Sequence, residues 1–141
     1  MNIYFACSIT GGREFESVYQ AITRALLADG QDVPTAHLAD PGVKAREGAA
    51  DSGEVFERDT AWIRGCDAVV AEVSTPSHGV GFEVAYALNL GKAVLCVYRE
   101  GQTISKMLTG NSHPLLHVVS YQNPEEAVAS IRSFLKELVR L

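Results

Sequence analysis

Residues 67–98, with the sequence DAVVAEVSTPSHGVGFEVAYALNLGKAVLCVY, contain the pattern that decides the fold. The apolar run at 67–73 predicts a strand, residues 74–79 a loop, and the apolar spacing over 80–90 a helix. Residues 93–98 are apolar throughout, which is typical of a strand covered on both faces. This order of strand, helix and strand predicts parallel strands joined by a crossover helix.

The same alternation continues on both sides of this segment. Further strands are predicted at 2–7, 32–37 and 115–121. Further helices are predicted at 13–29, from Asp51 onward, at 103–109 and after Asn123. Residues 38–51 are expected to form a loop.

The predicted fold class is α/β, with a single doubly wound domain over residues 1–141. It has a five-stranded parallel sheet of the Rossmann or flavodoxin-like type and helices on both faces. Ligands of such folds bind beyond the carboxyl ends of the strands. The loops expected to bind a ligand are therefore 8–13, 74–81 and 99–107.

Composition and charge exclude several classes of protein. The chain has 141 residues, 47% of them hydrophobic, and a net charge of −5, so we expect a folded protein. Without a basic stripe, a nucleic-acid polymer is a poor partner, but Gly-rich loops still permit small anions. The apolar runs are too short for a membrane span and no leader pattern is present, so we expect a cytoplasmic protein without a membrane partner. The three cysteines lack metal-ligand spacing, and no metal is expected.

Two acidic residues occupy positions that are unfavourable for acids. Asp59 lies within an apolar stripe of the second predicted helix, and Glu83 lies among apolar residues in the first turn of the third. A buried carboxylate destabilises the fold strongly unless it is paired. Each acid could be structural, with Asp59 bonded to a backbone amide or to Arg64 and Glu83 favouring its helix N-terminus. We favour the other interpretation, in which the two converge on a sugar and cleave a glycosidic bond.

Two loops carry small residues and backbone amides that suit an anion. Ser8-Ile-Thr-Gly-Gly-Arg13 and Ser77-His-Gly-Val-Gly81 each join a predicted strand to a helix, where phosphate binds readily. The candidate residues are Ser8, Gly11, Gly12, Arg13, Ser77 and Gly79. The alternative is that the glycines only permit tight turns, since Gly-Val-Gly is not a complete dinucleotide fingerprint. His37, at the end of a predicted strand, is a further candidate substrate contact.

Four segments together resemble one known family. They are YFACSITGGRE at 4–14, ERDTAW at 57–62, VAEVSTPSHGVGFE at 70–83 and ISKM at 104–107. In this order they look like motifs of the Rcl family of 2′-deoxynucleoside 5′-monophosphate N-glycosidases, within the nucleoside 2-deoxyribosyltransferase superfamily. That superfamily shares the Gly-Phe-Glu-x-x-Tyr-Ala…Gly-Lys pattern of residues 81–92. The resemblance implies hydrolysis of the N-glycosidic bond of a 2′-deoxynucleoside 5′-monophosphate, without a cofactor.

The resemblance also implies roles for individual residues. Glu83 would be the nucleophile that forms a glycosyl-enzyme intermediate, Asp59 would assist proton transfer, and Tyr4 would lie against Glu83. The family's phosphate contacts match Ser8, Ser77, Gly79 and Ser105, with Ser105 reaching the site of the neighbouring subunit in a homodimer. The family's base pocket matches Ile9, Val55 and Met107.

The chain departs from the family at Thr10, where the family has a phosphate-binding Arg. Loss of a bidentate donor should weaken selectivity for a 5′-phosphate, and Arg13 is a candidate replacement. Three alternatives to the hydrolase stay open. They are a transferase that exchanges bases, a ribonucleotide N-glycosidase of the CMP type, and a nucleotide-sensing module without catalysis.

Overall fold

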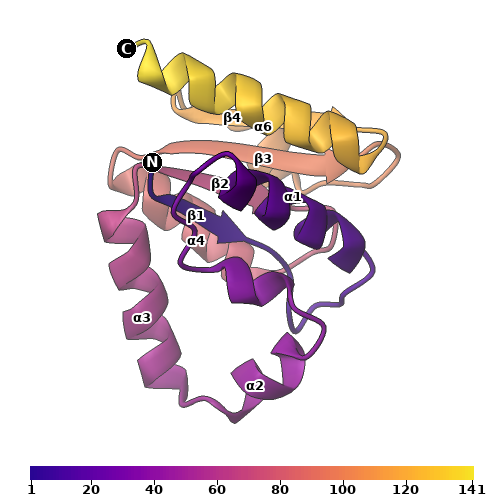
Figure 1. Ribbon diagram of the computed structural model, residues 1–141, viewed down its shortest axis with the longest axis vertical. Coiled ribbons are helices and arrows are strands. Elements are labelled where there is room, and N and C mark those ends of the chain that lie inside the picture. The colour runs from indigo at the N-terminus through magenta and orange to yellow at the C-terminus, as the bar shows by residue number, and fades with distance from the viewer.

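A parallel sheet forms the centre of the protein, which a computed structural model describes over residues 1–141 (Figure 1). Its strands are β1 (Ile3–Ala6), β2 (Ala68–Glu72), β3 (Ala93–Arg99) and β4 (Leu116–Tyr121), in the order β1-β2-β3-β4. Phe5 pairs with Val70 and Val70 with Leu95, all in parallel. The carboxyl ends of the strands therefore lie at the same edge of the sheet.

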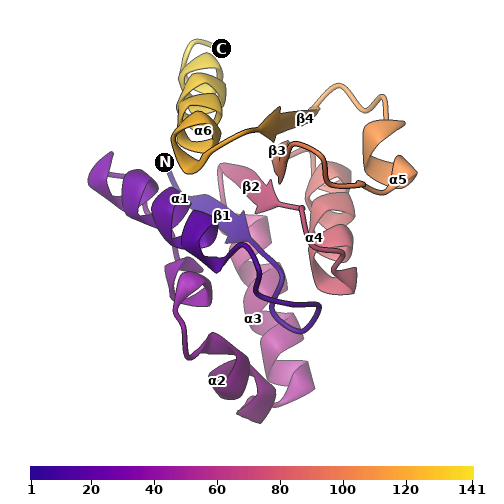
Figure 2. The ribbon, with the colours of Figure 1, turned by 90° about the vertical axis from the view of Figure 1, so that its right-hand side faces the viewer.

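Helices cover both faces of the sheet, as the alternation predicts. The helices α1 (Glu16–Ala28) and α6 (Pro124–Val139) pack on one face, and α3 (Ser52–Gly65) and α4 (His78–Asn89) pack on the other (Figure 2). Successive strand residues point to opposite faces. Phe5 and Val70 therefore join the core under α1 and α6, whereas Tyr4 and Val69 join the core under α3 and α4. A short helix, α5 (Lys106–Thr109), lies in the connection from β3 to β4.

The predicted fifth strand at 32–37 is wrong, because the sheet has four strands. Only one isolated bridge, between Asn2 and Asp32, continues the sheet beyond β1. Pro34 has no N–H to donate to a neighbouring strand, and the chain turns here into the 3-10 helix η1 (Ala36–Ala39). The Thr35 hydroxyl replaces a strand carbonyl, since it accepts a hydrogen bond from the Phe5 N–H at 2.9 Å.

The predicted loop at 38–51 is also partly wrong, because it contains the helix α2 (Val43–Ala49). Pro41 and Gly42 precede this helix and do not interrupt it. Val43 is fully buried in the core and fixes the start of α2 against the rest of the domain. Figure 1 shows α2 beside the first turns of α3, away from the sheet.

The predicted helix starts at Asp51 and Asn123 are confirmed by their caps, whereas the third helix begins at His78, two residues before its predicted start at 80. The side chains of Asp51, Ser77 and Asn123 each accept a hydrogen bond from a backbone N–H in the first turn of α3, α4 and α6. No helix is long and apolar enough to cross a bilayer. No group of three or more His, Cys, Asp or Glu side chains is placed to hold a metal ion.

The order of the chain across the sheet identifies the expected binding position. From β1 the chain passes through α1 to the bridge at Asp32, then returns through α3 on the opposite face to β2. Strand order thus reverses between β1 and β2, and their carboxyl ends form the switch point at which ligands of such folds bind. The two loops touch here: a Cβ added to Gly11 would lie 2.3 Å from the carbonyl oxygen of Pro76.

Candidate active site

A cavity of about 340 Å³ contains both suspected acids. Asp59 reaches it from the middle of α3, and Glu83 from the second turn of α4. The other lining residues come from the same two helices and from the end of α2. They are Glu47, Ala50, Ser52, Val55, Phe56, Thr60, Ile63 and Phe82. The contact between α3 and α4 therefore brings together two carboxylates that lie 24 positions apart in the chain.

Glu83 is largely enclosed and forms no ion pair. A Cβ on Gly79 would lie 4.0 Å from Glu83 Oε1, so the carboxylate turns back toward the start of α4. Burial, followed by the nearby charge of Asp59, raises the pKa of Glu83 to about 8. The Tyr4 hydroxyl lowers the pKa of Glu83, but this effect is smaller than those of burial and Asp59. This carboxyl group therefore gains a proton far more readily than an ordinary glutamate.

Tyr4 is fully buried, and its hydroxyl has no partner that meets hydrogen-bond geometry. Burial, then the charges of Glu83 and Asp59, raise the pKa of Tyr4 well above its usual range. The phenol is consequently a neutral donor that lies near Glu83.

Asp59 has a different electrostatic environment from Glu83. The neighbouring Arg58 donates from Nε to Asp59 Oδ1 at 2.8 Å. Burial still raises the pKa of Asp59, because the desolvation of its carboxyl group outweighs the attraction of Arg58. The alternative in which Asp59 pairs with Arg64 is wrong, since Arg64 donates to the Tyr86 hydroxyl at 3.2 Å.

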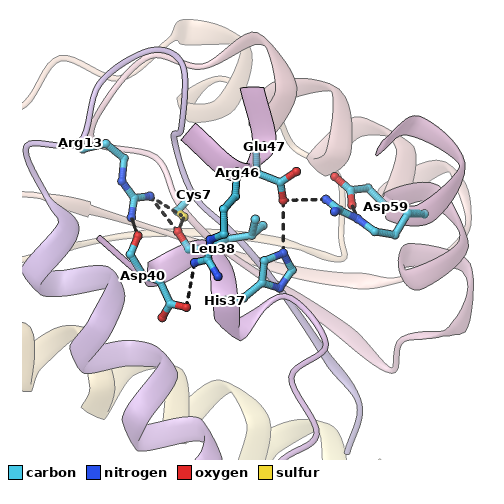
Figure 3. Close-up of polar contacts among 9 residues, drawn as sticks. Cys7, Arg13, His37, Leu38, Asp40, Arg46, Glu47 and Asp59 are labelled. Atoms are coloured by element: carbon cyan, nitrogen blue, oxygen red, sulfur yellow. Dashed lines mark hydrogen bonds and ion pairs between the residues drawn. The ribbon is translucent and has the colours of Figure 1, made fainter. Parts of the chain in front are cut away.

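A further carboxylate, Glu47, joins α2 to this site (Figure 3). Its Oε1 accepts from Arg58 Nη2 at 2.9 Å and lies 3.2 Å from His37 Nε2. Trp62 packs against both partners of Glu47: the Arg58 guanidinium lies 5.0 Å over its ring, and His37 meets it in an edge-to-face arrangement. His37 thus lies one residue away from the cavity and contacts it through Glu47, rather than lining it directly.

The loop after β1 contributes Ser8 and a tightly bonded arginine. Ser8 is fully buried and its hydroxyl has no hydrogen-bond partner. Arg13 Nη1 donates to the carbonyl oxygen of Leu38, and its Nη2 to that of Asp40 (Figure 3). Arg13 Nη1 also donates to the carbonyl oxygen of Ser8. Its Nε also pairs with Glu16. Most of the Arg13 donors are therefore used to tie this loop to η1, which leaves few for a ligand.

The remaining candidates are divided between the site and the periphery. Ser77 caps α4 and Gly79 lies in its first turn, next to Glu83. Gly12 has a φ of 132°, which a side chain would rarely adopt. Ile9 packs against the core under α1, and Val55 lines the cavity. Within this chain, Ser105 and Met107 do not reach the cavity; both are exposed on α5, Met107 at 81%.

Several residues of the site could not be recognised from the sequence. Glu47 lies in a segment expected to be a loop, so nothing connected it with Asp59. Phe82 was visible only as an apolar residue beside Glu83. Arg58 immediately precedes Asp59 in the ERDTAW motif, and this adjacency is the sequence signal that could identify it.

Comparison with known proteins identifies the family of this chain. The chain matches the nucleoside 2-deoxyribosyltransferase family over residues 3–127. The chain belongs to this family. It is 44% identical over 113 residues to the 5-hydroxymethyl-dUMP N-hydrolase of Mus musculus, with 77% of this chain and 65% of the mouse protein aligned. It is 37% identical to a putative 2′-deoxynucleoside 5′-phosphate N-hydrolase 1 of Methanococcoides burtonii, over 80% of this chain and 93% of the relative.

Two solved structures share the fold. A CMP N-glycosidase of Clostridium botulinum superposes with a TM-score of 0.72 at 16% identity, covering 95% of this chain and 99% of that one. A 2-deoxyribosyltransferase of Bacillus psychrosaccharolyticus superposes with a TM-score of 0.63 at 19% identity, covering 91% and 90%. The family and the enzyme class expected from the motifs, an N-glycosidase, are confirmed by the relatives named as N-hydrolases.

Proposed function

We propose that this protein hydrolyses the N-glycosidic bond of 2′-deoxynucleoside 5′-monophosphates, releasing the free base and 2-deoxyribose 5-phosphate. The observation that carries the proposal is the convergence of Glu83 and Asp59 on one cavity. The names of the N-hydrolase relatives support the substrate class.

In the proposed mechanism a covalent glycosyl-Glu83 intermediate forms first. A Glu83 carboxylate oxygen bonds to C1′ of the sugar as the bond from C1′ to the base nitrogen breaks. The departing base takes a proton from Asp59, whose pKa is raised by burial, or from a water held by Asp59. Water then attacks C1′, gives its proton to Asp59, and restores the Glu83 carboxylate. A 2′-deoxy sugar favours this path because no electron-withdrawing 2′-hydroxyl opposes the positive charge at C1′.

The 5′-phosphate is proposed to bind at the strand ends next to Glu83. Ser8 supports this position because its buried hydroxyl lacks a partner, and Ser77 and the Gly79 amide lie at the N-terminus of α4. Thr10 offers no charge where the family has Arg, and Arg13 is already bonded to backbone carbonyls. We therefore expect phosphate recognition to rest on neutral donors and on the helix, with Arg13 holding the loop in place.

The site is proposed to be completed by a second copy of the chain. Ser105 and Met107 are exposed and do not line the cavity of their own chain, which supports a contribution across a homodimer. Phe56 and Phe82 support the same arrangement, because they leave 53% and 49% of their surface exposed at the cavity rim.

The test is chromatography of the purified protein after incubation with deoxynucleotides, ribonucleotides and deoxynucleosides. Free base from deoxynucleotides alone is expected. Equal release from deoxynucleosides would show that the phosphate is not recognised, and base exchange with an added free base would indicate a transferase. Release from CMP but not dCMP would indicate a ribonucleotide hydrolase. Binding without release from any compound would overturn the proposal in favour of a nucleotide sensor.

A matched variant tests the shared site. Ser105→Ala should raise the KM for a deoxynucleotide more than that for the corresponding deoxynucleoside. An equal loss with both substrates would remove Ser105 from the phosphate site. Ser112→Ala, at an exposed position after α5, serves as the control.

A further inference from the structure

Of the two carboxylate oxygens of Glu47, one has hydrogen-bond partners and the other has none. Oε1 faces both Arg58 and His37, at 2.9 and 3.2 Å. Oε2 is buried and has no hydrogen-bond partner. The Glu47 side chain is 12% exposed, and the residue lines the cavity. A buried carboxylate oxygen without a donor is unfavourable, which makes it a position where a ligand's donor would be stabilised.

The electrostatic environment keeps Glu47 charged. Burial opposes ionisation, but the contacts with Arg58 and His37 outweigh it and hold the pKa of Glu47 below its usual value. An ionised carboxylate accepts hydrogen bonds and cannot donate them. A carbonyl oxygen placed against it is repelled, whereas an amino or hydroxyl hydrogen is bound by a charge-assisted bond.

The position of Glu47 relative to Glu83 shows which part of a substrate would meet it. The base is attached to C1′, the atom next to Glu83 in the proposed reaction. No residue of the phosphate loops 8–13 and 74–79 lines the cavity, which extends from Glu83 along α3 to the end of α2. A base attached at Glu83 and directed away from the phosphate loops would therefore enter the part of the cavity that Glu47 lines.

We propose that Glu47 selects the nucleobase, favouring a base with a hydrogen-bond donor on its outer edge over one with a carbonyl there. The inference rests on the proposed hydrolysis of deoxynucleotides. The donor could be an exocyclic amino group, as in cytosine, or the hydroxyl of a 5-hydroxymethyl group. Uracil, with a carbonyl and no substituent at these two positions, is the disfavoured base.

The test compares kcat/KM for dCMP, dUMP and 5-hydroxymethyl-dUMP. The wild-type protein should prefer dCMP or 5-hydroxymethyl-dUMP to dUMP by about tenfold or more, the usual effect of one charge-assisted bond. The compound that is preferred identifies which donor Glu47 binds. In Glu47→Gln the amide oxygen should stay with Arg58 and His37, so that the NH₂ group replaces Oε2. This change should reduce the preference by about tenfold or reverse it.

The ratio between substrates separates selection from a structural role. If Glu47 only braced Arg58 and Asp59, Glu47→Gln would lower turnover of every substrate equally and leave the ratio unchanged. Glu54→Gln, an exposed acid on α3 outside the cavity, should also leave it unchanged.

Each contrary result has a separate meaning. Hydrolysis of all three substrates with no wild-type preference, or with a ratio that Glu47→Gln does not alter, would overturn the inference alone. No hydrolysis of any substrate would overturn the proposed function and this inference with it. Should Glu47→Gln fail to fold, Glu47→Asp takes its place: its shorter side chain should reduce the preference, and an unaltered ratio would overturn the inference.

Discussion

Glu83→Gln should make the protein more stable at alkaline pH while abolishing turnover. The pKa of Glu83 in the folded protein is about 8, against 4.5 as its ordinary value. A folded-state pKa above the unfolded one means that the native protein binds the proton more tightly. The stabilisation is fully present below pH 4.5 and is lost as the pH rises through about 8. Glutamine has the same shape but never ionises, so it avoids this loss.

The size of the effect follows from the two pKa values. Linkage gives a loss of about 2 kcal/mol in the wild-type free energy of unfolding between pH 6 and pH 8 through this group. For a domain of this length that corresponds to a shift in Tm of roughly 6 °C. The gap between Glu83→Gln and wild type should widen by this amount over the same range.

The assay is urea unfolding of both proteins at pH 6, 7 and 8, with release of base measured on the same samples. A constant difference in stability across the pH range would refute the raised pKa of Glu83. Retained turnover in the variant would refute its role as nucleophile. Glu54→Gln removes an exposed charge from α3 and should show neither effect.

Three further predictions concern Asp59, Glu72 and Gly11. Asp59→Asn should lower the pKa of Glu83, because the charge of Asp59 raises it, so the loss of stability assigned to Glu83 should move to lower pH in urea titrations. An unmoved loss would contradict that coupling. Glu72 is fully buried at the end of β2, where burial raises its pKa to about 7. In urea unfolding, the free energy of unfolding of Glu72→Gln should therefore rise by about 2 kcal/mol relative to wild type between pH 5 and pH 8. The same pH dependence in both proteins would disprove the raised pKa. Gly11→Ala places a Cβ 2.3 Å from the Pro76 carbonyl oxygen. It should destabilise the folded protein by roughly 1–3 kcal/mol and raise the KM for nucleotides. The control is Gly65→Ala, whose Cβ meets open space, and similar Tm values for both variants would refute the close contact.

Most of the fold was predictable from the sequence because its signals are local. Apolar runs identified the four strands of the sheet, and the capping residues Asp51 and Asn123 mark the starts of α3 and α6. The fifth strand could not be rejected from apolar pattern alone. The deciding contact is the hydrogen bond from Phe5 N–H to the Thr35 side chain, which joins residues 30 positions apart.

The candidate site was predictable where a residue violates its local pattern. Asp59 and Glu83 interrupt apolar helix faces, so each was visible without any partner. Glu47 violates no local pattern, since an acid in an apparent loop is unremarkable. Its importance comes from tertiary contacts with Arg58 and His37, which only the folded chain brings together.

The two acids differ in a way that supports the roles proposed for them. Asp59 is bonded at 2.8 Å to Arg58, so its negative charge is already balanced by a fixed cation. Glu83 has no ion pair, and the only cation that influences it is the more distant Arg58, so the positive charge that develops at C1′ would be the first cation in direct contact with it. Burial makes the Glu83 carboxylate unfavourable in the free protein. The positive charge at C1′ would stabilise this carboxylate in the transition state more than in the free enzyme, and such a difference lowers the barrier. A balanced Asp59 gains less from that cation and is better suited to moving the proton.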